Sequence, residues 1–434
     1  MLKLIYQTIN NFFPDLFDDL REIKDSRKSP VYDISEIITA SLALFFFKEG
    51  SRNALNNDRV EGNFKKNFEN IFGLQLPHMD TVERVFRKLE EENGLELIKT
   101  NMIKALLSRK TLHKFRFLGK YFLVAIDGTG VASYEKRHCE KCLTQTSKTG
   151  KVTYSHQVLE AKIVCSNGFS LSIMTEWIEN PDGDFDKQDC ELKAFKRMAL
   201  KLKKIFPRLP ICIVVDGLYP NEPFFNICKA NNWRYIAMLQ EGTLPSIWKD
   251  VNDFYTIGEN ELSENVNENG KEVERHYAWL HDIDYRGHKL NWFFCRETYD
   301  KPNSDEEVKK FFAWVTDLEV SRKNIREFVA GGRLRWKIEN EGFNTQKNLG
   351  YNLQHKYSRN NYLAMKNYYQ SLQIAHLINQ LVELSTKCKN FMSGKNTIKH
   401  LWKCLLGFMI YGTISPQEIS ELSKHRVQFQ FQFQ

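Results

Sequence analysis

The chain has 434 residues, of which 42% are hydrophobic and 27% charged, and its formal net charge is +8. This composition is typical of globular proteins, and it excludes a disordered or collagen-like chain because the apolar side chains suffice for a sizeable core. A surplus of +8 permits a polyanionic partner without requiring one, so its location along the chain matters more than its size. The length suggests roughly two to four structural units.

The sequence carries no sign of export or of a membrane segment. Its first residues lack the charged-then-apolar pattern of a signal peptide. The longest apolar run, from Ile37 to Phe47, has 11 residues where a membrane-spanning helix needs about 20, so it predicts a buried helix. Nine scattered cysteines are typical of reduced thiols. We therefore expect a cytoplasmic protein without membrane contact.

Residues 1–115 are predicted to be helical. Asp33 and Glu36 have the spacing of a capping box ahead of the apolar run, and Asp80 and Glu83 repeat that spacing ahead of another helix. The basic side chains between the apolar positions of that second helix either face solvent or contact DNA: Arg84, Arg87 and Lys88.

From about residue 119 the pattern changes to strands. Apolar runs predict strands at 121–126, 154–165, 170–178, 211–215 and 233–239. Helical periodicity separates the last three, from about 189 to the proline at 207 and over 222–230. The order β-β-β-α-β-α-β predicts an α/β fold with a mixed sheet, a hairpin-rich start being followed by crossovers through helices.

The remainder of the chain departs from this alternation. Residues from about 241 to 310 combine polar, turn-rich segments such as 259–270 with short predicted strands such as 289–295, which favours a β-rich insertion. From Arg333 to about Cys404 the chain is again predicted to be helical. The tail, 427–434, alternates with period two and is expected to be exposed, either strand-like or disordered.

Two aspartates follow predicted buried strands, and each precedes a glycine: Asp127-Gly128 and Asp216-Gly217. An acidic side chain at the exit of an apolar strand sits on rigid backbone at a sheet edge, and the glycine lets a ligand approach closely. Two such carboxylates on neighbouring strands could bridge a hard divalent cation. The alternative is that both Asp-Gly pairs are turn chemistry.

A third carboxylate lies on the helix predicted to open after Gly331 and Gly332. Arg335 and Glu339 are four residues apart and share a face of that helix, as do Glu339 and Gln346, seven apart. With the predicted strand order, this helix resembles that of the DDE transposases of bacterial insertion sequences. One large group of these enzymes has a β-rich insertion before the last catalytic helix and carries Arg-x-x-x-Glu on it.

The resemblance covers roughly 119–360 and implies a ribonuclease-H-like catalytic core. It implies an N-terminal helical domain at 1–115, with DNA-end binding as its candidate role, and a first part of the core at 116–240. The β-rich insertion then occupies 241–325, the final catalytic helix 326–365, and C-terminal helices and the tail 366–434. The catalytic and metal-binding carboxylates carry over as Asp127, Asp216 and Glu339.

The chain departs from the family pattern at two positions. A tyrosine is frequent where this chain has Gly332, and a lysine is expected where it has Gln346, with Lys347 one residue on. Glu341 is an alternative to Glu339, but two residues apart on a helix they point in nearly opposite directions, and the Arg335 spacing favours Glu339.

The resemblance implies cut-and-paste transposition. Three such carboxylates would hold two Mg²⁺ or Mn²⁺ ions for phosphodiester cleavage at the element's ends and for attack of the freed 3′-hydroxyl on target DNA. It further implies double-stranded DNA as partner, a homodimer bridging two ends, and, in related enzymes, a hairpin intermediate with a flipped base. Trp292 and Trp314 are the candidates for stacking that base, with burial in the core as the alternative.

Other motifs indicate metals weakly. Cys139 and Cys142 with His156, and His138 nearby, could ligate zinc, free thiols in a turn being the alternative. His156 could instead face the carboxylates. Acidic residues at 182, 184 and 186 imitate a calcium loop, but Lys187 and Lys193 occupy positions that need glycine and glutamate, which favours a solvated loop.

The positive surplus is local. Residues 331–410 contain 12 Lys and Arg against 3 Asp and Glu, whereas the other 354 residues contain 50 against 51. Such clustering beside a carboxylate site would serve phosphate neutralisation. The candidate DNA-binding residues are Arg333, Arg335, Lys337, Lys347, Lys356 and Arg359. The alternatives to a transposase are a metal-dependent DNA nuclease without strand transfer and an inactive DNA-binding relic.

Overall fold

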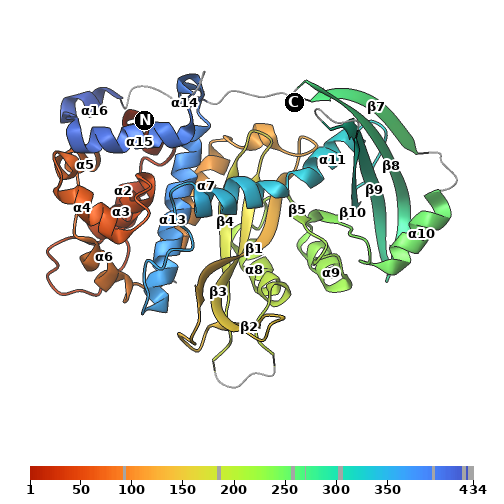
Figure 1. Cartoon of the computed structure of the whole chain (residues 1–434), viewed down its shortest axis with the longest axis horizontal. Coiled ribbons are helices and arrows are strands. Elements are labelled where there is room, and N and C mark those ends of the chain that lie inside the picture. The colour runs from red at the N-terminus through yellow and green to blue at the C-terminus, as the bar shows by residue number, and fades with distance from the viewer. Residues whose placement is uncertain are drawn as a thin grey trace.

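A ten-stranded mixed sheet forms the centre of the part of the molecule that the computed structural model describes, with helices packed on both faces (Figure 1). The described residues are 1–90, 94–182, 187–255, 260–268, 270–301, 306–392, 396–422 and 427–428. The strands follow the order β2-β3-β1-β5-β6-β10-β9-β8-β7, and β4 pairs with β3 off this path. The chain is therefore a mixed α/β protein.

The middle of the sheet is built from the strands that the apolar runs predict. β1 (Phe122–Tyr134) pairs antiparallel with β3 (Val152–Val164), which pairs antiparallel with β4 (Ser170–Ile178). On its other side β1 pairs parallel with β5 (Ile211–Val215), and β5 pairs parallel with β6 (Arg234–Met238). The connecting helices are α8 (Glu191–Ile205) and α9 (Glu222–Asn231). The predicted succession of elements is confirmed, with β2 (Leu143–Thr146) added as a hairpin partner of β3.

The insertion extends this sheet. After α10 (Pro245–Tyr255) come the antiparallel strands β7 (Glu261–Glu268), β8 (Lys271–Tyr285), β9 (His288–Asp300) and β10 (Glu307–Thr316). β10 pairs with β6, so the central sheet continues into the insertion, as the green and teal arrows in Figure 1 show. The prediction of short strands and a turn-rich segment was wrong here, because the polar residues of β7 and β8 occupy the solvent-facing side of long strands.

Both faces of the central strands are buried. Phe122, Val124 and Ile126 of β1 belong to the larger hydrophobic cluster, whereas Leu123 and Ala125 belong to a second cluster with the helix α11 (Ile325–Arg333). Because side chains alternate between faces along a strand, a strand covered on both sides is a continuous apolar run.

The N-terminal region is helical, as predicted. Its elements are α1 (Leu2–Phe12), α2 (Leu16–Arg21), α3 (Ile34–Phe46), α4 (Arg52–Val60), α5 (Phe64–Phe72), α6 (Met79–Phe86), α7 (Leu95–Ser108) and a short 3-10 turn (His113–Phe115). Every residue of α3 is buried, and Asp33 and Glu36 form the predicted capping box. The second capping box was wrong: the His78 ring caps α6, and Glu83 is buried, where it accepts a hydrogen bond from Ser358.

The long helix α13 (Tyr362–Glu383) lies between the N-terminal helices and the sheet (Figure 1). α12 (Thr345–Asn348) precedes it, and α14 (Thr386–Phe391), α15 (Ile398–Tyr411) and α16 (Pro416–Leu422) follow. None of the described helices is long and apolar enough to cross a membrane. Of the tail, only Val427 and Gln428 are described, and the rest of that prediction lies outside the described residues.

A buried polar network fastens α13 to the sheet. Glu160 and Lys162 on β3 are both fully buried, with the Lys162 ammonium 3.9 Å from the Glu160 carboxylate. Glu160 also accepts hydrogen bonds from Ser172, Thr175 and Tyr369. Lys162 donates to Gln373 of α13 at 3.0 Å. Burial lowers the pKa of Lys162 to about 8, so at neutral pH the ammonium is charged and depends on these partners.

Replacing Lys162 with methionine should destabilise the protein by roughly 3–5 kcal/mol, because the substitution keeps the volume but leaves the Glu160 carboxylate buried without its cation. Chemical denaturation would measure the loss. Adding Glu160→Gln should recover most of the stability, since the remaining hydroxyl donors suit a neutral amide. Equal losses in the Lys162→Met variant and the double variant would contradict this coupling.

Candidate active site

Two of the predicted carboxylates lie on one face of the sheet. Along β1, Asp127 lies on the same face as Leu123 and Ala125, because alternate residues of a strand share a face. Asp216 directly follows β5 and lies on the same face as Cys212 and Val214. β1 does not end at Ile126 as expected but runs on to Tyr134, so Asp127 lies within it, just beyond the last residue pair that β1 forms with β5. Both carboxylates therefore flank the point where the two parallel strands part.

The glycines beside these aspartates make room for side chains. A Cβ on Gly128 would lie 2.3 Å from a carboxylate oxygen of Glu191, and one on Gly217 would lie 2.7 Å from the Gln240 side chain. We expected these glycines to admit a ligand. In the structure, the side chains of Glu191 and Gln240 occupy the space beside these glycines instead of a ligand.

Glu339 reaches the same place from an irregular helix. α11 begins at Ile325, before the two glycines, so the prediction that the helix opens after them was wrong. A π-helical segment, Ile338–Asn344, follows and carries Glu339. Gly332 is required by packing, because a Cβ there would lie 2.7 Å from the Trp314 ring. π-helical turns are rare and frequently occur at functional sites.

Arg335 connects two of the carboxylates. Its guanidinium donates to Glu339 at 2.7 Å and lies 3.6 Å from Asp127, and its side chain is only 9% exposed. The predicted spacing of four residues therefore forms a real contact between Arg335 and Glu339. Glu339 itself is half-exposed.

The carboxylates repel one another. Burial is the main cause that raises the pKa of Asp127 to about 7, the Arg335 guanidinium opposes it, and the negative charges of Glu339, Glu191 and Asp216 raise it further. Burial and the charge of Asp216 also raise the pKa of Glu191, against a hydrogen bond from Tyr219. The charges of Glu339, Glu191 and Asp216 thus all act on Asp127, and among the described residues the Arg335 guanidinium contacts Asp127 and Glu339.

Glu191 is the site residue that the sequence reasoning missed. It is the first residue of α8, and its neighbour Cys190 is the helix N-cap. In the sequence it appears only as an acidic residue in a first helical turn, a common position. The sequence clue that could have pointed to Glu191 is Gly128, because a glycine leaves space for another side chain to pack against it.

The rival positions on the helix lie elsewhere. Glu341 accepts a hydrogen bond from Lys337 and is not among the charges that act on Asp127. Gln346 is fully buried and bonds Gln373 and His376 of α13. The expectation that Glu339 and Gln346 share a face was wrong, because π-helical i→i+5 bonding turns less per residue than an α-helix.

The six candidate DNA-binding residues lie in different environments. Arg335 is buried among the carboxylates, Arg333 bonds Glu297, and Lys337 bonds Glu341. The other three pair with no carboxylate among the described residues: Lys347 and Lys356, half-buried over the rings of Phe343 and Tyr134, and exposed Arg359.

The two candidate stacking tryptophans belong to the core. Trp292 and Trp314 are each 2% exposed, so the core alternative is correct for both. A different aromatic pair is accessible: Phe311 of β10 is 53% exposed and lies 6.3 Å from the half-buried ring of Trp248 on α10. Both line a surface hollow that includes Gln240, the residue against Gly217. The hollow is therefore connected to the neighbourhood of Gly217 through the Gln240 side chain.

The cysteine motif comes together away from the carboxylates. Cys139, Cys142 and His156 converge, whereas Asp127 lies opposite Glu160 and His156 opposite Ala132 on the paired strands. His156 therefore faces the thiols. Of the imitation calcium loop, Asp182 pairs with Lys141, and positions 184 and 186 lie outside the described residues.

The donor set at the sheet face suits a hard cation. Asp127, Asp216, Glu339 and Glu191 offer only oxygen atoms, the ligands of Mg²⁺ and Mn²⁺. When all four are ionised, the one guanidinium leaves three negative charges uncompensated. Divalent cations would neutralise this excess, and the donor chemistry of these residues suits such ions, although no three of these four described residues bring carboxylate oxygens within 4.8 Å of one another.

Comparison with known proteins finds a likeness among solved structures. The chain matches no protein-family model and no curated protein. Among solved structures it is similar to the piggyBac transposase in a synaptic complex with hairpin DNA, at 11% sequence identity and a TM-score of 0.45. The match covers 98% of this chain and 85% of that one.

Removing the Asp127 charge should stabilise the metal-free protein at alkaline pH. Because the folded-state pKa of about 7 lies above the ordinary 3.8, the folded chain binds the extra proton between these values, and stability falls as pH rises through them. Asp127→Asn escapes that loss. In a chelator, its melting temperature should exceed that of the wild type at pH 8, and the difference should shrink toward pH 5. A difference that stays constant with pH, or a variant less stable at pH 8, would argue against carboxylate crowding.

Proposed function

We propose that this protein is a DNA transposase of the DDE type, which cleaves phosphodiester bonds at the ends of an insertion sequence and joins them to target DNA. The observation that carries the proposal is that Asp127, Asp216 and Glu339 come from three separate elements and that burial, together with the charges of the other two carboxylates and Glu191, raises the pKa of Asp127 to about 7. Perturbed carboxylates gathered in this way are typical of functional sites.

The strand order supports a ribonuclease-H-like core. In the order β4-β3-β1-β5-β6, the first three strands pair antiparallel and the last three parallel. This is the arrangement that the resemblance of the sequence implies, with the carboxylates on the first strand, after the fourth strand and on a late helix. Continuation of the sheet into β10 is consistent with an insertion before that helix.

Asp127, Asp216 and Glu339, with Glu191 as a fourth ligand, would hold the cations. Bound there, Mg²⁺ or Mn²⁺ supplies activation of the attacking hydroxyl and stabilisation of the leaving oxygen. Arg335 orients Glu339 through its 2.7 Å hydrogen bond and offsets part of the negative charge. Tyr219 donates to Glu191 and fixes its side chain.

The DNA backbone would be neutralised by the basic residues without carboxylate partners among the described residues: Lys347, Lys356 and Arg359. They belong to the segment that holds the positive surplus of the chain. Since phosphate contacts position DNA without reading its sequence, these residues would serve both element ends and target. Two copies of the chain would bridge the two ends.

The catalytic assignment predicts a sharp pattern of activities. Asp127→Asn, Asp216→Asn and Glu339→Gln should each reduce cleavage by at least about 10³-fold, because loss of a metal-binding carboxylate removes several kcal/mol of transition-state stabilisation. Glu191→Gln should reduce it by roughly 10–100-fold. The assay uses the full chain, Mg²⁺ and DNA from both flanks of its coding region, with cleavage and strand transfer measured separately.

Glu341→Gln is the matched control, because it removes a nearby carboxylate bonded to Lys337, and it should leave cleavage unchanged. Loss of activity in Glu341→Gln with full activity in Glu339→Gln would overturn the assignment. Cleavage without any strand transfer would identify a nuclease, and metal-independent binding without cleavage an inactive relic.

The exposed aromatic pair predicts where an unstacked base would bind. Trp248→Ala or Phe311→Ala should weaken binding of DNA with an unpaired terminal base by roughly 10–100-fold, since stacking contributes about 1–3 kcal/mol per base. Fully paired DNA should be affected much less. Fluorescence anisotropy measures both affinities. Phe254→Ala, which removes another exposed ring of the same insertion, is the control, and an equal effect of all three variants would contradict the prediction.

A further inference from the structure

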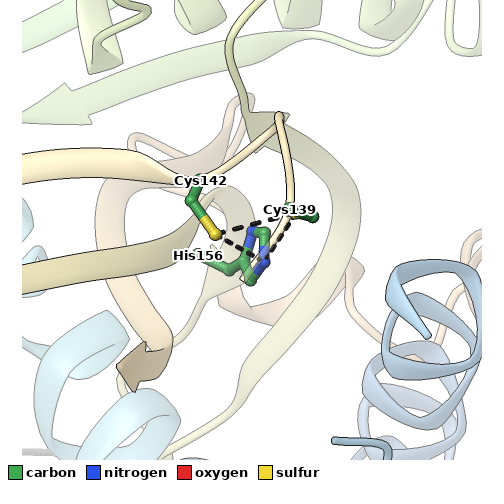
Figure 2. A group of neighbouring side chains, drawn as sticks. All are labelled: Cys139, Cys142 and His156. Carbon is green, nitrogen blue, oxygen red and sulfur yellow. Dashed lines mark hydrogen bonds between the residues drawn. The ribbon is translucent and has the colours of Figure 1, made fainter. Parts of the chain in front are cut away.

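Cys139, Cys142 and His156 form a compact cluster at the edge of the core (Figure 2). The two cysteines come from the connection between β1 and β2, and the histidine from β3. The sulfur atoms are 3.6 Å apart, and each lies 3.4 Å from Nε2 of His156. Figure 2 shows the three side chains pointing toward one another.

These distances fit a tetrahedral zinc ion. Two Zn–S bonds of about 2.3 Å at a tetrahedral angle separate the sulfurs by about 3.8 Å, and a Zn–N bond of about 2.1 Å places the nitrogen about 3.6 Å from each sulfur. The observed separations are within about 0.2 Å of these values, whereas a disulfide would need about 2.05 Å between the sulfurs. All cysteines among the described residues are free.

The surroundings hold the three donors in place. Cys142 is fully buried, and its carbonyl accepts a hydrogen bond from Asn180 at 2.9 Å. The ring of His156 is stacked on Tyr362 at 4.3 Å, and the two thiols are its polar partners among the described residues, since Nδ1 has none. A buried imidazole aimed at two sulfurs is arranged as a ligand rather than as a solvated side chain.

We propose that Cys139, Cys142 and His156 bind one Zn²⁺ ion that clamps the β1–β2 connection onto β3. Soft thiolates with one imidazole select zinc over Mg²⁺, so this site would be chemically separate from the carboxylates. Asp127 and Ala132, the residue opposite His156, are five residues apart on β1, or roughly 17 Å. A solvent molecule would complete the tetrahedron, since Cys139 is only half-buried.

The clamp has a structural consequence that does not depend on the proposed function. Residues 135–151 connect β1 to β3, and β2 is the regular element within this segment. Tyr134, the last residue of β1, stacks on the His138 ring, and the Lys356 ammonium lies over the Tyr134 ring. A metal bridge from this segment to β3 would fix its position. Removing the metal should therefore loosen the segment while leaving the central sheet folded.

The test is the metal content of the full-length protein purified under reducing conditions from zinc-supplemented cells. Elemental analysis should find about one zinc per chain, and cobalt substitution should give thiolate-to-metal charge-transfer absorption. Cys139→Ser should reduce the zinc content to a small fraction and speed proteolysis within 135–151. Cys139 is half-buried and Cys142 fully buried, so the Cys139→Ser variant should keep the wild-type circular dichroism, and Cys142→Ser serves as a second variant.

Cys404→Ser is the matched control. Cys404 is exposed and lies 3.5 Å from His400 on α15, which makes this pair the rival thiol–imidazole site. Zinc content should be unchanged in this variant. The proposal is overturned if the folded wild type takes up no zinc, if zinc survives Cys139→Ser and is lost in Cys404→Ser, or if mass spectrometry finds a Cys139–Cys142 disulfide in the reduced preparation.

Discussion

The buried contact between Glu160 and Lys162 is the constraint on which the rest of the structure depends. Two opposite charges without solvent exposure must satisfy each other and their remaining hydrogen bonds inside the protein. Glu160 accepts hydrogen bonds from hydroxyl groups of β4 and from Tyr369, and Lys162 donates one to Gln373. Gln373 also accepts a hydrogen bond from Gln346, which lies just after the π-helical segment. Glu160 is also the cross-strand neighbour of Asp127. One polar network therefore fixes sheet, α13 and the helix of Glu339 relative to one another.

The candidate active site differs from that network in how its charges are compensated. The buried network pairs its charges, whereas Asp127 contacts one guanidinium, and its burial, with the charges of three neighbouring carboxylates, raises its pKa to about 7. Such a site costs stability in the folded protein and is held together by the surrounding packing. The proposed cation site and its rigid support are therefore two parts of one arrangement, in which paired charges lie beside uncompensated ones.

The sequence was most informative where local rules decide the structure. The apolar runs located β1, β3, β4, β5 and β6, because strands covered on both faces need apolar residues throughout. The capping box at Asp33 depends on side chains three residues apart and was also correct. It failed at Asp80, where a tertiary contact with Ser358 removes Glu83 from the cap. The length of β7–β10 was missed, since half-buried polar strands resemble turns in sequence.

The sequence by itself determined the order of the core strands and helices, the apolar runs that lead into Asp127 and Asp216, and the Arg335–Glu339 pairing, because each depends on residues near one another in the chain. Only the tertiary structure decided the rest. It brought Glu191 against Gly128, withdrew Gln346 into the core through a π-helical turn, buried Trp292 and Trp314, and set His156 beside two cysteines. These outcomes depend on which distant segments pack together and on helix phase, and packing between distant segments leaves no periodic pattern in the sequence.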